Sequence, residues 1–156
     1  MAKNPLWNAP RIVPSLAYED VPKAVEWLSR AFGFRERIEA RLTGTAPGQG
    51  NWVLTWMELG DGLINLGTAG GHDVCSPKSV GKVTQSLKVY VDDIDRHFER
   101  AKAAGATVIS EPKDEFWGGR IYRAKDLEGH DWTFSQIGME LDSAEWKLPK
   151  GVNRHG

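Results

Sequence analysis

The chain has 156 residues, which suits one domain of ordinary size, and its 40% hydrophobic content is typical of a globular protein. Twenty basic residues against 21 acidic residues leave a net charge of −1, so the basic excess typical of nucleic-acid-binding proteins is missing. Because there is no membrane-length apolar run, no visible secretory leader and only one cysteine, we expect a cytoplasmic protein without membrane partners or internal disulfides.

The first predicted elements are a short strand and a helix. Leu16 and Tyr18 alternate with smaller residues, which indicates a half-buried strand. Asp20 precedes apolar residues at helical spacing, and its carboxylate can accept the free N–H groups of a first helical turn. Gly33 is suited to the left-handed conformation that ends a helix. Strand-like segments follow at 35–42, 51–59 and 63–66, with a mobile hairpin expected at 43–50.

The same order of elements returns 73 residues later. Asp93 corresponds to Asp20 and Ile94 to Val21, and Gly105 ends the second helix. An alternating strand precedes this helix at 86–91, and strand-like segments follow at 107–110, 120–125 and 131–136. Each half therefore reads strand–helix–strand–strand–strand. About 60 residues bury too little surface to fold alone, so the halves must share a core or a cleft.

This repeat predicts the domain boundaries. We expect one domain over residues 10–138, made of a module at 10–67 and a second module at 82–138. A loop rich in glycine, serine and proline joins them at 68–81, and a weakly patterned C-terminal tail occupies 139–156.

Several segments agree with one known family in order and spacing. They are Leu-Ala-Tyr-Glu-Asp at 16–20, Glu-Trp-Leu at 26–28, Ala-Phe-Gly-Phe at 31–34, Val-Asp-Asp-Ile at 91–94, Ala-Ala-Gly-Ala at 103–106 and Asp-Leu-Glu-Gly-His at 126–130. With them the chain resembles the vicinal oxygen chelate superfamily, which holds glyoxalase I, bleomycin-resistance proteins and extradiol dioxygenases. The resemblance covers about residues 11–136. It implies an α+β fold of two tandem βαβββ modules whose concave sheets surround a cleft, and it implies a homodimer, which would also cover exposed strand edges.

The resemblance also locates the metal-binding positions of the superfamily. In its metal-using members, four inward-facing positions supply His, Gln or Glu ligands. Carried over to this chain, they fall on Val13, Ser86 and Thr133, and on or beside Asn65. Valine binds no metal, and amide and hydroxyl groups are poor substitutes for imidazole and carboxylate. The resemblance therefore implies a member without metal or cofactor, closest to the bleomycin-resistance branch, and argues against glyoxalase I or dioxygenase activity.

Seven tryptophans suggest either a heavy core or a pocket for a flat ligand. Trp52 and Trp56 fall on one strand face with Glu58, which would offer two stacking surfaces and one anionic group to a cationic or hydrogen-bonding aromatic compound. The alternative is that both tryptophans pack in the core. Trp27 belongs to the core in the family pattern, and Trp132 is expected there too.

Polar residues provide the remaining ligand-binding candidates. Lys88 and Tyr90 share a strand face with Ser86, so they either orient a ligand in the cleft or form a solvated surface. Trp117 and Arg120 belong to a glycine-containing loop that reads as a lid, a dimer contact or a hydrophobic plug, with Arg120 able to pair with an acidic ligand group. The complete set of candidates is Trp52, Trp56, Glu58, Asn65, Ser86, Lys88, Tyr90, Trp117, Arg120 and Thr133.

The histidines suggest no catalytic set. His97 is expected to pack on its helix, and His130 to begin a strand after a turn, while His72 and Cys75 read as loop residues. The leading hypothesis is a metal-free protein that sequesters a flat or aromatic, antibiotic-like compound without converting it. A lyase, isomerase or hydrolase with an unrecognised site is the enzymatic alternative, and an interaction module with a vestigial cleft is the third.

Overall fold

The computed structural model describes residues 8–48, 50–71 and 73–155. No helix among them is long and apolar enough to cross a membrane. The elements of the first half are β1 (Ser15–Tyr18), α1 (Val21–Phe32), β2 (Arg35–Glu36), a 3₁₀ turn (Ile38–Ala40), β3 (Leu42–Ala46), β4 (Gly50–Leu59) and β5 (Gly62–Thr68). After the one-turn helix α2 (Pro77–Val80), the second half contains β6 (Ser86–Val91), α3 (Ile94–Ala103), β7 (Thr107–Asp114), β8 (Arg120–Lys125), β9 (Asp131–Gln136) and a 3₁₀ turn (Ser143–Glu145).

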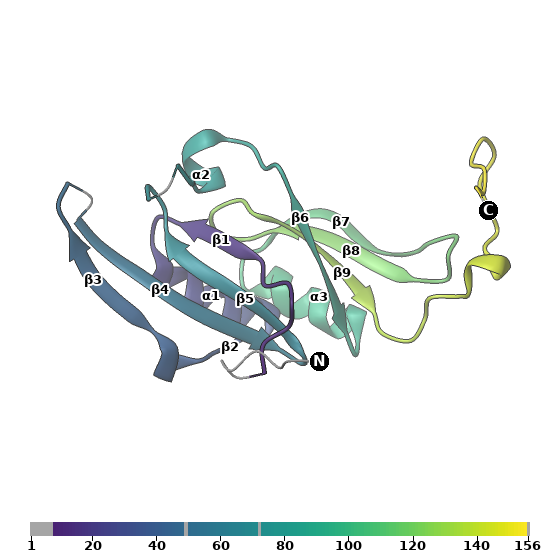
Figure 1. Ribbon diagram of the computed structural model, residues 1–156. Coiled ribbons are helices and arrows are strands. Elements are labelled where there is room, and N and C mark those ends of the chain that lie inside the picture. Colours follow the sequence, from purple (N-terminus) through teal and green to yellow (C-terminus); the bar gives the residue numbers. More distant parts are fainter. Residues whose placement is uncertain (1–7, 49, 72, 156) are drawn as a thin grey trace.

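The strands form two sheets of the same design (Figure 1). The first sheet has the order β1-β5-β4-β2, with β3 also pairing with β4, and the second has the order β6-β9-β8-β7. In each sheet the opening strand runs parallel to the last strand of its module, and the other pairs are antiparallel. The strand register repeats as well. Ser15 of β1 lies opposite Asn65 of β5, and the corresponding residue of β6, Lys88, lies opposite Thr133 of β9. The predicted α+β fold of tandem βαβββ modules is confirmed.

Both long helices begin as their sequences predict. The Asp20 side chain accepts a hydrogen bond from the Lys23 N–H, and the Asp93 side chain accepts one from the Arg96 N–H. Gly33 ends α1 with φ = 82°, a conformation that costs other residues steric strain.

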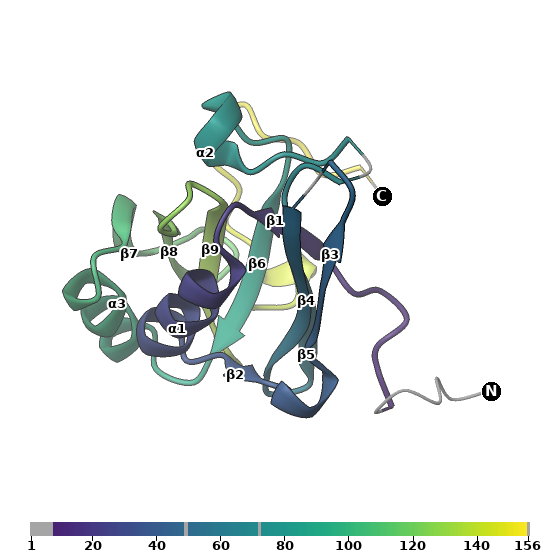
Figure 2. The ribbon, with the colours of Figure 1, turned by 90° about the vertical axis from the view of Figure 1, so that its left-hand side faces the viewer.

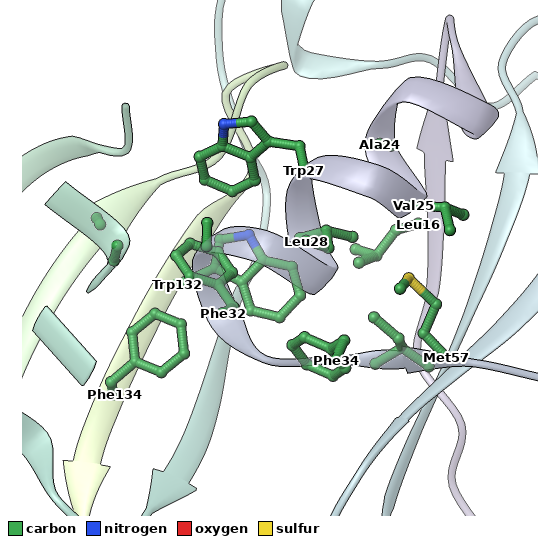
Figure 3. Close-up of a cluster of buried hydrophobic side chains, with 14 of the residues drawn as sticks. Leu16, Ala24, Val25, Trp27, Leu28, Phe32, Phe34, Met57, Trp132 and Phe134 are labelled. Atoms are coloured by element: carbon green, nitrogen blue, oxygen red, sulfur yellow. The ribbon is translucent and has the colours of Figure 1, made fainter. Parts of the chain in front are cut away.

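The core lies where the two helices meet the two sheets. Helices α1 and α3 lie side by side, together on one side of the molecule (Figure 2). Phe32 sits at the centre and contacts the rings of Trp27, Trp132 and Phe134 (Figure 3). Phe32, Trp132 and Phe134 are completely buried, and the Trp27 indole donates a hydrogen bond to the Ala104 carbonyl at 3.0 Å. The core placement expected for Trp27 and Trp132 is therefore confirmed, and these aromatic contacts join the modules.

A buried carboxylate network strengthens this junction. Asp126, which follows β8, accepts hydrogen bonds from the Tyr18 hydroxyl at 2.6 Å and from the Trp132 indole at 3.0 Å. Its other oxygen accepts the backbone N–H groups of Glu128 and His130, both at 3.0 Å. Burial first, and then the adjacent Asp126 charge, raise the pKa of Tyr18 well above its ordinary value, so the hydroxyl remains a donor.

Glu128 continues the network towards the first module. Its carboxylate accepts the backbone N–H groups of Glu19 and Asp20, just before α1, and the hydroxyl of Ser76. The ring of His130 is buried and lies 2.8 Å from the carbonyl oxygen of Ala17. The expectation for His130 was only that it begins a strand. Its contact with Ala17 was not predicted, because the two residues are 113 positions apart in the sequence.

Three sequence predictions need correction. The mobile hairpin expected at 43–50 is in part a paired strand, because 42–46 form β3 and pair with β4. The expected strand at 35–42 is interrupted by the 3₁₀ turn, and the strand expected at 107–110 continues to Asp114. Gly44 explains the first error: a Cβ atom there would lie 2.5 Å from the Trp52 ring, so the glycine lets this ring pack against β3. His72 lies outside the described residues, and Cys75 is exposed.

Candidate functional site

Each sheet has one face against the helices and an opposite face, which we call its open face. On β4, Thr55 and Met57 are completely buried towards the helices, whereas Trp52, Leu54 and Trp56 alternate with them and are half-buried. The shared strand face expected for Trp52 and Trp56 is confirmed, and it is the open face of the first sheet. The apolar stripe on that face consists of Leu42, Trp52, Leu54 and Trp56, with Leu42 directly opposite Leu54.

The end of this stripe carries a neutralised charge. Glu58 pairs with Arg35 and, at 2.6 Å, with Arg37. The anionic group expected to attract a cationic ligand is therefore already bound by two guanidinium groups of the protein. These pairs were missed because Arg35 and Arg37 lie across the sheet on and beside β2, a strand whose bounds the sequence did not resolve.

Polar residues lie beside the stripe on β1 and β5. The Ser15 hydroxyl donates a hydrogen bond to the Asn65 side-chain oxygen at 2.8 Å, and the Asn65 amide nitrogen donates one to the Thr55 carbonyl at 3.3 Å. On the second sheet, the Ser86 hydroxyl lies 3.2 Å from an oxygen of Asp131 and 3.5 Å from that of Thr133. The contacts of Ser15 and Asn65 therefore lie within the first sheet, and those of Ser86 lie within the second.

The four positions carried over from metal-using proteins do not fit a divalent metal ion. Val13 lies just before β1 and offers no donor atom, while Asn65, Ser86 and Thr133 offer one amide and two hydroxyl groups. Divalent transition metals are usually held by imidazole, thiolate or carboxylate groups. In the part of the chain that the structure describes, no group of three or more His, Cys, Asp or Glu residues gathers to provide such a set elsewhere.

A pocket of about 420 Å³ opens where the first sheet meets the linker between the modules. Ser15, Ala17 and Gly67 contribute its sheet side, and Val74 of the linker and Val83 just after it contribute apolar groups. Its volume lies in the range of pockets that hold small organic molecules. The pocket continues the open face of the first sheet, because Ser15 and Ala17 stand opposite Asn65 and Gly67 on that face.

A larger cavity of about 660 Å³ lies between the end of α1 and the start of α3. Of the predicted site residues it includes Tyr90. His97 lines it, but its ring nitrogens already lie 2.7 Å from the Tyr122 hydroxyl and 2.9 Å from the Phe32 carbonyl oxygen. Burial lowers the pKa of His97, which favours a neutral packed ring, as expected for this residue.

The open face of the second sheet is polar and is partly covered by the C-terminal tail. Lys88 lies 2.6 Å from a carboxylate oxygen of Glu140, and the Tyr90 hydroxyl lies 3.0 Å from both oxygens. The Ser135 hydroxyl donates to the same group at 3.4 Å. The bonds from Lys88 and Tyr90 hold the pKa of Glu140 below its ordinary value. Ser135 continues the alternation from Thr133, but no sequence pattern pointed to Glu140.

Trp117 and Arg120 are directed to different parts of the molecule, the C-terminal tail and helix α3. The Trp117 carbonyl accepts a hydrogen bond from the Leu141 N–H at 2.8 Å, so its loop is attached to the tail. Arg120 binds Asp95 of α3 at 2.9 Å and Asp114 at 3.0 Å. The guanidinium that was expected to meet an acidic ligand therefore points towards α3 rather than the open face.

Comparison with known proteins places these features in a family. The family model of the Glyoxalase/Bleomycin resistance protein/Dioxygenase superfamily matches residues 11–134. The uncharacterized protein Mb0911c of Mycobacterium bovis is 28% identical over 142 residues, which cover 87% of this chain and 89% of that protein.

Two solved structures are similar to the whole arrangement. TioX from Micromonospora sp. ML1 is 34% identical, with a TM-score of 0.62 covering 82% of this chain and 98% of TioX. A glyoxalase family protein from Bacillus cereus has a TM-score of 0.64 and is 19% identical, covering 91% of this chain and 99% of its own. Because the Bacillus cereus protein is only 19% identical, its similarity to this chain concerns the fold alone.

Proposed function

This chain belongs to the Glyoxalase/Bleomycin resistance protein/Dioxygenase superfamily, and we propose that it binds a flat or aromatic small molecule without a metal ion and without converting it. The observation that carries the proposal is the apolar stripe on the open face of the first sheet, where two half-buried indole rings flank Leu54. Large apolar side chains that face away from the core are suited to a ligand or a partner.

The neighbouring groups support a small molecule as the occupant. Asn65 and Ser15 place an amide and a hydroxyl beside the stripe, and a few polar groups within an apolar surface orient a ligand. The adjoining pocket of about 420 Å³ offers the concave volume that a flat sheet face lacks. The donor set at Val13, Asn65, Ser86 and Thr133 supports binding without metal.

Removing the stacking surfaces should weaken binding. Each aromatic contact contributes roughly 0.5–1.5 kcal/mol beyond area burial, so Trp52→Ala and Trp56→Ala are each expected to lower the affinity for a bound aromatic compound up to about tenfold. Calorimetry with the best binder from a panel of aromatic antibiotics and dyes measures the change, and mass spectrometry after incubation should recover that binder unaltered.

The control is Trp146→Ala, which removes an indole of the C-terminal tail and should leave the affinity unchanged. Full affinity in both β4 variants would place the site elsewhere, and chemical conversion of the binder would establish an enzyme instead.

We also infer a homodimer in which a second copy covers part of the open faces. Leu42, at one edge of the apolar stripe, is 50% exposed in the single chain, and a symmetric partner would bury it. Sedimentation at micromolar concentration is expected to give twice the 17.3 kDa chain mass, and Leu42→Arg should shift the protein towards the monomer. A 17.3 kDa species for the unchanged protein contradicts the dimer, and a dimeric Leu42→Arg variant contradicts this face as its interface.

A further inference from the structure

The tail of the protein places a carboxylate on the open face of the second sheet. Glu140 is bound there by Lys88, Tyr90 and Ser135, with the distances given above. Ser135 is completely buried although it faces away from the helices, and its hydroxyl donates to Glu140 of the tail. Three donors from two neighbouring strands therefore converge on one carboxylate.

We propose that Lys88, Tyr90 and Ser135 form a subsite for the carboxylate of an aromatic acid, and that Glu140 occupies this subsite only until such a ligand replaces it. The proposal rests on the proposed function, the binding of aromatic small molecules, and adds a position on the second sheet that selects aromatic carboxylates.

The charges on this face favour an anion. Asp131 is already engaged by Arg123 at 2.8 Å, so it does not neutralise Lys88. Glu140 supplies the counter-charge of Lys88, and its departure would leave an ammonium and a phenolic hydroxyl facing a vacant position. Charge-assisted hydrogen bonds of this kind are stronger than neutral ones, so an external carboxylate gains what Glu140 loses.

Trp117 supports the subsite independently, because it offers a hydrogen-bond donor that nothing in the described structure uses. Its indole N–H is buried and has no hydrogen-bond partner among the described residues. A Cβ atom at Gly119 would lie 2.6 Å from that nitrogen and 3.3 Å from Cγ of Glu140, so the indole lies close to the Glu140 side chain. A buried donor without an acceptor costs free energy, which a ligand in place of Glu140 could recover. The ring itself offers an aromatic acid a stacking surface.

The tail segment that carries Glu140 is attached weakly enough for a ligand carboxylate to replace the Glu140 side chain. After β9 the chain turns at Gly138 with φ = 77°, and Met139 and Leu141 beside Glu140 are more than 40% exposed. The hydrogen bond from the Leu141 N–H to the Trp117 carbonyl ties this segment to the β7–β8 loop. Because few apolar groups are buried by the segment, its displacement costs little compared with unfolding.

The test compares 2-naphthoate with the neutral 2-naphthamide by calorimetry. Glu140→Ala removes the internal competitor and is expected to tighten 2-naphthoate binding by about tenfold or more without changing 2-naphthamide binding. Glu145→Ala, a glutamate of the same tail outside the cluster, is the matched control and should change neither affinity. Adding Lys88→Gln to Glu140→Ala should abolish the gain, and 2-naphthoate should shift the Trp117 indole resonance in Glu140→Ala protein.

Equal affinity for the two probes in Glu140→Ala protein overturns the carboxylate subsite and leaves the proposed function standing. Failure of both probes to bind the Glu140→Ala protein also overturns the subsite. The proposed function is judged separately, by the compound panel and the Trp52 and Trp56 variants, so the two failures are distinguishable.

Discussion

Replacing Asp126 by alanine is expected to lower the free energy of unfolding by about 3–5 kcal/mol. The carboxylate accepts four hydrogen bonds, and the substitution leaves the Tyr18 hydroxyl, the Trp132 indole N–H and two backbone N–H groups buried without their acceptor. A buried donor that loses its partner pays its full desolvation cost. Urea unfolding followed by circular dichroism measures the loss.

Two further variants separate this network from a general effect of removing a carboxylate. Asp61→Ala changes an exposed aspartate in the turn between β4 and β5, and it should cost less than about 0.5 kcal/mol. Tyr18→Phe removes one donor, so combining it with Asp126→Ala should cost less than the sum of the single changes, with a coupling between about 0.5 and 3 kcal/mol. Additive losses, or an Asp126→Ala protein as stable as the Asp61→Ala protein, would show that the network contributes little.

Replacing Phe32 by alanine is expected to lower the free energy of unfolding by about 3–5 kcal/mol. The ring is completely buried at the end of α1 and contacts Trp27, His97, Trp132 and Phe134, which come from both modules. Its loss removes apolar burial and leaves a cavity that aromatic neighbours fill only in part. Because these contacts join the modules, a single unfolding transition is expected to remain, at a lower midpoint.

Phe116→Ala is the matched control, because Phe116 is a half-buried phenylalanine that contacts Trp117 and Trp146 near the tail. It should cost clearly less than Phe32→Ala. Separate unfolding of the two modules in the Phe32→Ala protein would mean that the shared core does not make them one cooperative unit.

Local signals were sufficient for the two long helices, their caps and the repeat, whereas several strand bounds needed correction. Asp20 and Asp93 cap their helices as predicted, because capping depends on backbone groups three residues away. The placement of Trp52 and Trp56 on one face follows from the two-residue period of a strand, which requires no knowledge of the rest of the fold. The sequence could not decide that this face lies away from the helices, since either face of β4 carries apolar residues.

The sequence by itself determined the two βαβββ modules, their caps and the core placement of Trp132, because each depends on residues a few positions apart or on a period within one element. Only the tertiary structure decided how the charged groups are used. Glu58 is neutralised by Arg35 and Arg37, and Arg120 points to Asp95, across 25 residues. Glu140 reaches Lys88 across 52 residues. Such ion pairs depend on which strands and tail residues the fold brings together, since a long charged side chain can pair with any opposite charge within its reach.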